Sequence, residues 1–389
     1  MSILCIVCHY GEIGIKGKNR GFFERALQKN IVQALKKHQI PFEKATIINE
    51  RIVLLLDESY FEKTGEILKN IPGMSFFCFA LKCETKLENI NECALNLLQK
   101  EKGNTFRIST QRANKQFALT SLQINVCVGS FIVEKLNKKV KLKGADVECF
   151  IEIVNKFSYI YTKKQRGIGG LPVGVSGTVV SLMSGGIDSP VASFLMMKRG
   201  AKVIFVHFHA FPYTSRASIE KVKKIVNALN KFQLKSKIYF VPFSEIQKHI
   251  FEKTQGLAEK QRIIIYRRFM LKITEKISKK ENSKAIVTGD SLGQVASQTS
   301  DNMFVISKAT KYPIFRPLIG FDKEEIIVLS KKIDVFNLSI LPCQDVCSRF
   351  LPKNPTTKSN LEAVKRIENQ LPSVKLINGA LKNADVLEI

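Results

Sequence analysis

The sequence predicts an α/β protein with more than one domain. Apolar segments with strand and helix periodicity alternate along most of the chain. From residue 175 onward the alternation is regular, which predicts a doubly wound parallel sheet with its ligand site at the carboxyl ends of the strands. A chain of 389 residues is also long for a single core, so two or three domains are expected.

Residues 1–57 are expected to form a small domain. Strands are predicted at Ile3–His9 and Arg51–Leu56, with a helix between them. Apolar side chains recur every four residues in that helix, at Phe23, Leu27, Ile31 and Leu35. The loop before the helix is rich in glycine and carries the cations Lys16, Lys18 and Arg20. It is either an ordinary connection or a contact for phosphate.

Residues 58–165 are expected to form a second α/β domain. Phe106 and Ile108 alternate with polar residues, which predicts a strand over Thr105–Thr110. A helix at about Leu119–Leu136 and strands at about Cys149–Val154 and Phe157–Tyr161 should follow. Residues 166–174 contain four glycines and a proline and are predicted to form an interdomain linker.

Residues 175–389 are expected to form the doubly wound domain. Strands are predicted at Thr178–Met183, Lys202–His207, Ser236–Val241 and Lys284–Thr288. Helices are predicted at residues 189–199, Ser218–Phe232 and Gln261–Ser278.

The string SGGIDS at residues 184–189 stands between the first of these strands and the first helix. Gly185 and Gly186 lack a Cβ atom, so backbone N–H groups can approach an anion closely. Asp188 or Ser189 could cap the helix, whose dipole also favours negative charge. The spacing is not that of a P-loop. By itself the string does not separate a phosphate-binding turn from a turn without a ligand.

The charge distribution predicts a polyanionic partner. The formal net charge is +27, from 61 Lys and Arg against 34 Asp and Glu. Nucleic acid is favoured over a membrane surface, because no basic helix has an obvious lipid-binding face. Between residues 104 and 145 a single acid, Glu134, accompanies eight cations, namely Arg107, Arg112, Lys115, Lys135, Lys138, Lys139, Lys141 and Lys143. A Lys-rich composition overall would explain the total charge but not this local run.

The first residues carry no basic region of a signal peptide, and no apolar stretch reaches the length of a membrane span. A cytoplasmic protein without membrane attachment is therefore expected. Its nine cysteines are an odd number and lie mostly in apolar segments, so they are predicted to be core residues and not disulfides.

Five strings in order resemble the tRNA 4-thiouridine synthetases, which are PP-loop ATP pyrophosphatases. They are SGGIDS at 184–189, His207-Phe-His209, residues 288–299 (TGDSLGQVASQT), residues 316–320 (RPLIG) with Asp322-Lys323, and residues 352–358 (PKNPTTK). Residues 12–20 are similar to the opening of that family's ferredoxin-like domain, and residues 105–165 resemble its RNA-binding THUMP domain. The likeness covers nearly the whole chain, and it corresponds to the short form of the family without a rhodanese domain.

The resemblance implies an ATP-dependent tRNA sulfurtransferase that adenylates a uridine, at position eight of tRNA, and replaces its oxygen with sulfur. It implies catalytic roles for Asp188, also as a Mg²⁺ ligand, and for Lys323. The implied ATP-binding residues are Met183, Ser184, Gly185, Gly186, Ser189, His207, Phe208, Arg267, Gly289 and Gln298. The implied tRNA-binding residues are Lys16, Lys18, Arg20, Arg107, Arg112, Lys115, Lys138, Lys139 and Lys141.

Sulfur delivery requires a nucleophilic cysteine, and the resemblance selects Cys347, eight residues before Pro355. A cysteine desulfurase or another donor would load it with a persulfide. Several relatives have adjacent cysteines here, whereas this chain has Val346 before Cys347 and a further Cys343. Cys343 could resolve the persulfide, could have no role, or could help to ligate an iron–sulfur cluster, although two cysteines alone are too few ligands for a cluster.

Three functions remain in competition on sequence grounds. The first is the tRNA sulfurtransferase, and a homodimer is one assembly that it could form. The second keeps the ATP site but uses a different acceptor, and the basic RNA-binding half argues against a small one. The third is a tRNA-binding protein without catalysis, against which the intact SGGIDS string, Lys323 and Cys347 argue.

Overall fold

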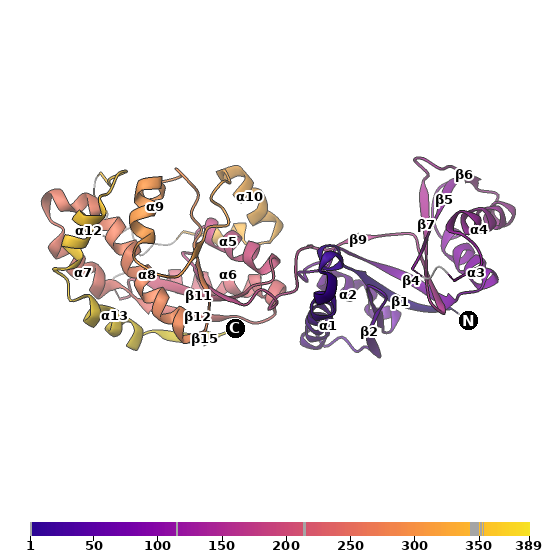
Figure 1. The fold of residues 1–389 in the computed structure, drawn as a ribbon, viewed down its shortest axis with the longest axis horizontal. Coiled ribbons are helices and arrows are strands. Elements are labelled where there is room, and N and C mark those ends of the chain that lie inside the picture. Colours follow the sequence, from indigo (N-terminus) through magenta and orange to yellow (C-terminus); the bar gives the residue numbers. More distant parts are fainter. Residues whose placement is uncertain (1, 114–115, 213–214, 343–349, 351, 353) are drawn as a thin grey trace. The chain divides into compact units, whose positions relative to one another are not determined.

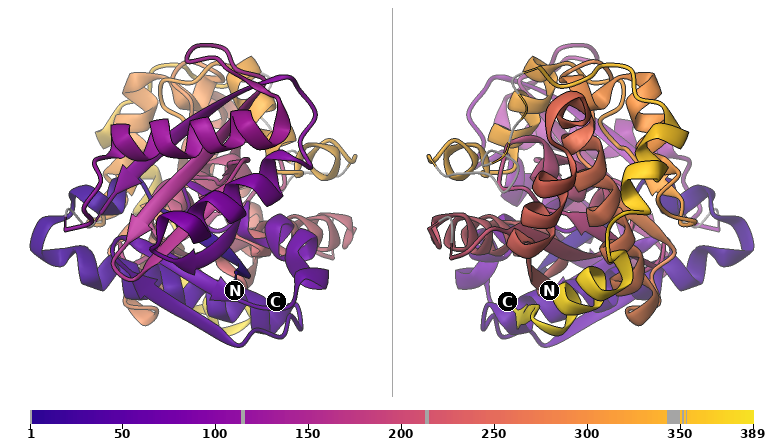
Figure 2. Two further views of the ribbon diagram at one scale, coloured as in Figure 1. Left: turned by 90° about the vertical axis from the view of Figure 1, so that its right-hand side faces the viewer. Right: turned by 90° about the vertical axis from the view of Figure 1, so that its left-hand side faces the viewer.

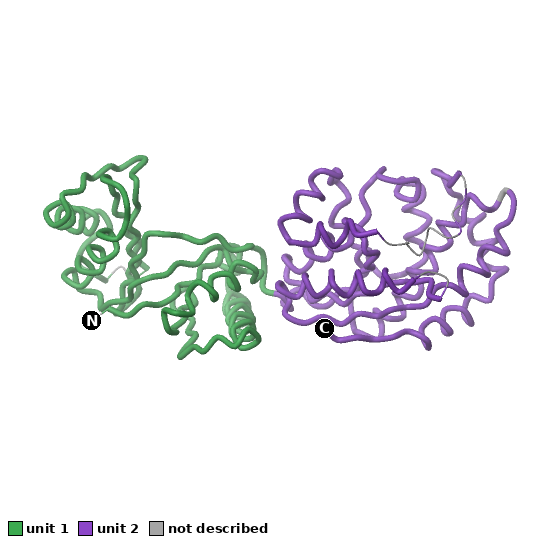
Figure 3. The backbone as a smooth tube through the Cα atoms, turned by 180° about the vertical axis from the view of Figure 1, so that it is seen from behind, with its two compact units in different colours: residues 1–172 green, residues 173–389 purple. Residues whose placement is uncertain are grey.

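The computed structural model describes residues 2–389 except 114–115, 213–214, 343–349, 351 and 353. The chain divides into two compact units, residues 1–172 and 173–389 (Figure 3). The boundary lies inside the glycine-rich segment 166–174. Each unit has its own sheet and its own apolar core.

The strands described in the first unit form one nine-stranded sheet. The order is β2 (Lys44–Ile48), β3 (Arg51–Leu55), β1 (Ile3–His9), β4 (Phe76–Glu84), β8 (Phe157–Tyr161), β7 (Val147–Val154), β5 (Thr105–Arg112) and β6 (Lys139–Val140), and β9 (Gln165–Arg166) pairs with β4. Neighbours from β2 to β7 are antiparallel, whereas β5 is parallel to both β7 and β6. Strand β4 was not predicted from the sequence, yet it pairs with β1 and β8 and so joins the two halves of the sheet.

The helices of the first unit are α1 (Arg20–Lys37), α2 (Phe61–Leu68), α3 (Leu87–Leu98) and α4 (Ser121–Leu136), which can be followed in Figure 1. The predicted stripe of α1 is confirmed, because Leu27, Ile31 and Leu35 are fully buried. Helices α3 and α4 share a core with β5, β7 and β8. A capping box between Thr120 and Gln123 fixes the start of α4.

The second unit contains the predicted doubly wound sheet. Its strand order is β14 (Ile314–Phe315), β13 (Ala285–Val287), β10 (Thr178–Leu182), β11 (Lys202–His209), β12 (Lys237–Pro242) and β15 (Asp385–Glu388). The strands are parallel except for β15, which is antiparallel to β12. The order reverses between β10 and β13, and a ligand crevice is expected outside the carboxyl ends of strands at such a point.

Helices lie on both faces of this sheet. One face is covered by α5 (Asp188–Lys198) and α6 (Ala217–Gln233), with α10 (Lys323–Lys332) against α5 and α11 (Phe336–Ser339) against α6. The other face is covered by α7 (Ser244–Lys253), α8 (Arg262–Lys280), α9 (Ser300–Ser307), α12 (Leu361–Glu368) and α13 (Ser373–Lys382). The last two helices, yellow in Figure 2, pack against α8. The helices and strands predicted for this domain are confirmed to within a few residues at their ends.

The described cysteines agree with the prediction that they do not form disulfides. All seven are free, and all except Cys127 are buried. Burial raises the pKa of Cys5 and of Cys149 to about 12, so these thiols stay protonated. Among the helices that the structure describes, none has the length and apolar character needed to cross a membrane.

A buried ionic network connects the two ends of the first unit's sequence. Glu152 on β7 accepts hydrogen bonds from Arg51 on β3 and, at 2.6 Å, from the hydroxyl of Tyr161 on β8. The Nε2 atom of His9 lies 3.3 Å from Glu152 Oε1. Burial would raise the pKa of Glu152, but His9, Arg51 and Tyr161 outweigh it and hold the pKa below its usual range. Removing one partner of such a buried pair typically costs about 3–5 kcal/mol.

Burial lowers the pKa of His9 from 6.5 to about 4, so the imidazole is neutral near pH 7. The unfolded chain binds a proton at this residue more readily than the folded chain does. The contribution of neutral His9 to the free energy of unfolding is therefore complete above pH 6.5 and is lost as the pH falls toward about 4. His207, whose pKa is also lowered to about 4, acts in the same direction.

We expect the thermal unfolding midpoint of the chain to fall as the pH is lowered through this range. His9→Gln keeps a polar side chain that does not titrate, so it should weaken the pH dependence. Thermal unfolding followed by circular dichroism from about pH 7.5 to about pH 4.5 measures this. The exposed His38→Gln is the matched control. Equal pH dependence in all three proteins contradicts the role of His9.

Candidate active site

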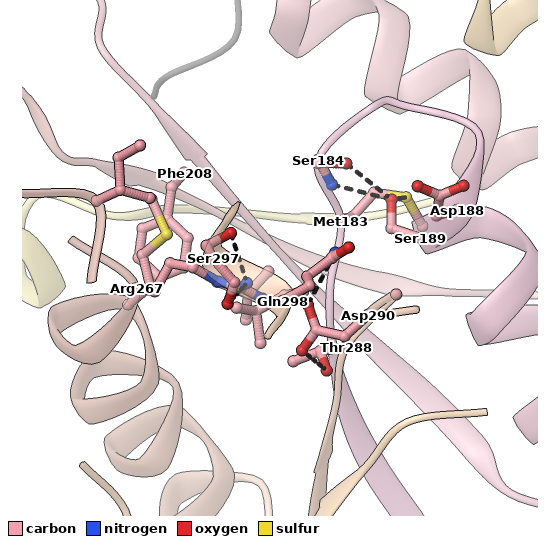
Figure 4. A pocket seen from close by; sticks show the side chains of 15 residues that line it. Met183, Ser184, Asp188, Ser189, Phe208, Arg267, Thr288, Asp290, Ser297 and Gln298 are labelled. Atoms are coloured by element: carbon pink, nitrogen blue, oxygen red, sulfur yellow. Dashed lines mark hydrogen bonds and ion pairs between the residues drawn. The ribbon is translucent and has the colours of Figure 1, made fainter. Parts of the chain in front are cut away.

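The glycine turn after β10 is held in shape by its own serines. The backbone N–H of Ser184 donates to Ser189 Oγ at 3.1 Å (Figure 4). The N–H of Gly186 donates to Ser184 Oγ at 3.2 Å. Gly185 has φ +84°, a conformation that favours glycine, and a Cβ atom here would lie 3.3 Å from Val222 on α6. The turn therefore presents a preformed backbone at the carboxyl end of β10.

The predicted cap of the following helix is wrong. Helix α5 starts at Asp188, and its N-cap, Ile187, makes no side-chain cap hydrogen bond. The Asp188 carboxylate instead accepts from Lys323, and the Ser189 hydroxyl contacts Ser184 and Met183. Because neither side chain caps α5, the backbone N–H groups of its first turn remain able to bind an anion.

Asp188 is the meeting point of three segments. The Nζ atom of Lys323, at the start of α10, donates to Asp188 Oδ1 at 2.5 Å. The Nε2 atom of Gln294, on the loop after β13, donates to Asp188 Oδ2 at 2.9 Å. A capping box between Asp322 and Glu325 fixes the beginning of α10 and so the position of Lys323.

A cavity of about 300 Å³ lies at the carboxyl ends of β10, β11 and β13, and Asp188 is one of its lining residues. Its walls combine apolar and polar side chains (Figure 4). Of the residues expected to bind ATP or act in catalysis, it is lined by Met183, Ser184, Asp188, Ser189, Phe208, Arg267, Gly289 and Gln298. Gly185, Gly186 and Lys323, which were expected to belong to the site, are not among the lining residues. Thr288, Asp290 and Ser297 also line the cavity and belong to the 288–299 string, which was expected to form a wall of the nucleotide pocket. The remaining lining residues, which the sequence did not indicate, are Leu182, Val206, Ile263 and Met270.

His207 does not line the cavity. Its side chain is buried beneath the turn, and its Nδ1–H donates to the carbonyl of Met183 at 2.8 Å. Burial lowers the pKa of His207 to about 4. His207 is therefore neutral near pH 7, and its hydrogen bond holds Met183, the residue before the glycine turn, in place.

Asp290 lies in the 288–299 string, but no individual role was predicted for it from the sequence. Its carboxylate is buried and accepts from Arg267, from Thr288 at 2.8 Å and from Arg316 at 3.3 Å. Burial would raise the pKa of Asp290, but Arg267, Thr288 and Arg316 outweigh it and keep the pKa below its usual range. Asp290 therefore fixes Arg267 at the cavity wall. An acidic residue directly after a buried strand, in the string TGD, is the sequence signal that could have found it.

Cys343 and Cys347 lie outside the described residues. The chain on either side of residues 343–349 is described. Before it, Lys221 on α6 donates to the carbonyls of Ser339 at 2.8 Å and of Leu341 at 2.7 Å. After it, the buried Asn302 donates to the carbonyl of Thr356 at 2.8 Å and accepts from the N–H of Ser359 at 2.9 Å. Both flanks are therefore attached to elements of the second unit.

The cations expected to bind RNA differ in their surroundings. Lys18, Lys139 and Lys141 are exposed. Lys16 pairs with Glu12, Arg20 with Glu50 and Arg107 with Glu148. Arg112 donates to the carbonyls of Phe117 and Leu119, and Lys138 donates to those of Leu98 and Glu101. Lys115 lies outside the described residues.

A cavity of about 540 Å³ in the first unit adds residues that the sequence did not indicate. Lys164 lies 3.8 Å from the centre of the Phe150 ring, and the Phe150 and Tyr161 rings stack on each other. Arg107 also lines this cavity. Cations beside aromatic rings are the combination on which unpaired bases stack, although Tyr161 is buried and Phe150 is only partly exposed.

Comparisons with protein families cover most of the chain. The family described as "Thiamine biosynthesis protein (ThiI)" matches residues 174–372, the ThiI ferredoxin-like domain matches 5–78, and the THUMP domain matches 84–163. A protein of Thermus thermophilus named "Probable tRNA sulfurtransferase" is 39% identical over 387 residues, which is 100% of this chain and 94% of the relative. One of the same name from Geobacillus kaustophilus is 40% identical and covers 99% of this chain and 95% of the relative.

Two solved structures are similar over all or most of this chain. A 4-thiouridine synthetase in complex with RNA and bound ATP has 33% identity and a TM-score of 0.88, and the match covers 100% of both chains. The protein PH1313 of Pyrococcus horikoshii has 26% identity and a TM-score of 0.67, over 86% of this chain and 100% of its own.

Gly289 provides a direct test of the cavity's construction. A Cβ atom at Gly289 would lie 2.9 Å from Ser189 N and 3.0 Å from Asp188 C, both backbone atoms. We expect Gly289→Ala to push the loop away from α5, to weaken ATP binding, and to cost about 1–3 kcal/mol of unfolding free energy. Equilibrium dialysis with ATP and urea unfolding measure these effects.

The control for this prediction is Gly320→Ala, because a Cβ atom at Gly320 meets nothing within 4 Å. That variant should match the wild type in both measurements. If Gly289→Ala also binds ATP normally, the close approach of the loop to α5 is not needed for the nucleotide site.

Proposed function

The chain belongs to the ThiI family of tRNA sulfurtransferases, and from this we propose that it makes 4-thiouridine in tRNA, at position eight, by activating a uridine with ATP and then replacing its oxygen with sulfur. One observation supports this proposal above all: Ser184 of the glycine turn, Asp188 and Arg267 line one cavity, and Lys323 donates a hydrogen bond to Asp188. The cavity lies at the point of the sheet where nucleotides are expected to bind.

The activation step transfers AMP to the uridine. The 4-oxygen of the uridine attacks the α-phosphorus of ATP, the bond to the β-phosphate breaks, and pyrophosphate leaves. The N–H groups of the glycine turn and the first turn of α5 would bind the phosphate oxygens as negative charge moves onto pyrophosphate. Arg267 supplies positive charge at the cavity wall, and Lys323 supplies it beside Asp188.

Mg²⁺ suits this site as a companion of the nucleotide. Within the described part of the chain there is no group of three or more His, Cys, Asp or Glu residues that could hold a metal. Mg²⁺ commonly binds through one or two carboxylates together with substrate phosphates, and Asp188 offers such a carboxylate beside the turn. When bound, the ion would offset the charge of the phosphates.

Sulfur transfer completes the proposed reaction. A cysteine desulfurase or another donor converts Cys347 to a persulfide, and its terminal sulfur attacks carbon 4 of the activated uridine. The carbon–oxygen bond breaks and AMP leaves, so the tRNA is joined to Cys347 through a disulfide. The thiol of Cys343 attacks Cys347, which releases 4-thiouridine and forms a Cys343–Cys347 disulfide. An external thiol then reduces that disulfide.

The first unit is the proposed tRNA-binding part. Its exposed lysines on and after β6 suit phosphate contacts, and the cavity beside Lys164 suits unpaired bases. Binding of tRNA by this unit separates recognition from activation within the chain.

Asp188→Ala should abolish activation without changing tRNA affinity. The substitution removes the partner of Lys323 and Gln294, whereas the proposed RNA-binding residues belong to the other unit. ATP–pyrophosphate exchange in the presence of tRNA and a filter-binding titration on the same protein measure both properties. Exchange at the wild-type rate removes Asp188 from the mechanism.

Replacing Lys139 and Lys141 with Ala should weaken tRNA binding and reduce its salt dependence. When two phosphate contacts are lost, tRNA binding releases fewer counterions. The slope of log K against log salt should therefore fall by about 2 in total. The control replaces Lys375 and Lys382, which are exposed on α13 and remove the same charge. An unchanged slope places the RNA surface elsewhere.

Cys347→Ser should support ATP–pyrophosphate exchange but yield no 4-thiouridine from a persulfide donor, because a hydroxyl cannot carry the transferable sulfur. Cys343→Ser should thiolate tRNA once an external thiol such as dithiothreitol replaces the internal one. If Cys343 is a cluster ligand, the loss persists with dithiothreitol and visible absorbance disappears with it. Full single-turnover thiolation by Cys347→Ser from a persulfide donor shows that another cysteine is the acceptor.

A further inference from the structure

Gln294 holds the carboxylate on which the proposed activation step depends. Its Nε2 donates to Asp188 Oδ2 at 2.9 Å, while Lys323 Nζ donates to Asp188 Oδ1 at 2.5 Å. Asp188 is therefore held from two sides, by one neutral donor and one charged donor. Gln294 is not among the residues that line the cavity, so its contact with the site runs through Asp188.

The loop that carries Gln294 is attached to the segment that carries Lys323. The N–H of Leu292 donates to the carbonyl of Ile319 at 3.1 Å, and the hydroxyl of Ser291 donates to the carbonyl of Phe321 at 2.7 Å. Residues 319–321 directly precede the cap of α10. The segments that carry the two donors to Asp188 are thus hydrogen-bonded to each other, which fixes the positions of Gln294 and Lys323 relative to one another.

The unpaired oxygen of the Gln294 amide indicates that Gln294 is placed to orient Asp188. An ionised carboxylate only accepts, so the amide must turn its nitrogen to Asp188. Its oxygen, Oε1, is then buried without a hydrogen-bond partner in the described structure. Buried polar atoms are normally paired, and exceptions concentrate at functional sites. The Gln294 side chain therefore makes the hydrogen bond that orients Asp188, although its own amide oxygen is then left without a partner.

The two donors respond differently to a bound nucleotide. The Lys323 side chain is 44% exposed, and its ammonium is attracted by the phosphates of ATP. The same phosphates repel the Asp188 carboxylate. A neutral amide experiences neither strong force, so Gln294 can keep its hydrogen bond while Lys323 leaves Asp188.

We propose that Gln294 is a positioning residue for uridine activation, which keeps Asp188 oriented when Lys323 turns to the phosphates of ATP. This inference rests on the proposed function. Gln294 acts only through Asp188, so its loss should slow activation and leave the binding of ATP itself nearly unchanged.

Two substitutions separate hydrogen-bond donation from shape. Gln294→Met keeps the length of the side chain without a donor, and Gln294→Glu keeps its shape but presents an acceptor. Both should lower the rate of tRNA-dependent ATP–pyrophosphate exchange by about 10–100-fold, the usual effect of removing a group that orients a catalytic ligand. ATP affinity, measured by equilibrium dialysis, should stay within about twofold of the wild type. Thiolation with free sulfide should fall in the same proportion as exchange, because Gln294 acts before sulfur arrives.

Gln255→Met is the matched control, because Gln255 is exposed and donates to the carbonyl of Phe251, away from the cavity. It should behave as the wild type, and thermal unfolding of every variant checks that it is folded. Wild-type exchange by Gln294→Glu overturns the proposal, since shape alone would then suffice. A loss of ATP affinity as large as the loss of exchange also overturns it. Absence of exchange in both the wild type and Gln255→Met overturns the proposed function, and this inference with it.

Discussion

The close approach of the loop after β13 to the start of α5 is the constraint on which the site depends. At Gly289 the loop lies so near the backbone of Asp188 and Ser189 that no Cβ atom fits. This approach brings Gln294 to Asp188, and the loop's hydrogen bonds to residues 319–321 bring Lys323 to the same carboxylate. These contacts lie at the point where the strand order of the parallel sheet reverses, between the neighbouring strands β10 and β13. A single cavity thus collects groups from segments that are far apart in the sequence.

Charge is used in two ways in this chain. In the interior, ionised groups are paired and oriented, as Glu152 is by Arg51 and Asp290 is by Arg267. Their carboxyl pKa values are held below the usual range although burial alone would raise them. At the surface the net charge of +27 includes exposed cations, among them Lys139 and Lys141. The interior pairs stabilise the two units, whereas the surface excess suits a polyanion such as tRNA.

Local patterns predicted the elements well and the contacts poorly. The strand, glycine turn and helix at residues 178–198 follow from adjacent residues, so the sequence indicates them directly. Gln294 and Asp188 are 106 residues apart, and no local signal connects them. Lys138 is part of a cationic run in the sequence, yet its ammonium donates to the carbonyls of Leu98 and Glu101. The failed cap at Asp188 has the same origin, because a distant lysine and glutamine compete for that carboxylate.

The central claim is that this chain activates a uridine of tRNA with ATP and then thiolates it. The most direct test incubates unmodified tRNA with the purified chain, ATP, Mg²⁺ and sulfide, and analyses the digested nucleosides by mass spectrometry. 4-Thiouridine should form only when ATP is present, with one AMP and one pyrophosphate produced for each thiolated uridine. Consumption of ATP without any 4-thiouridine, or 4-thiouridine formed without ATP, would contradict the central claim.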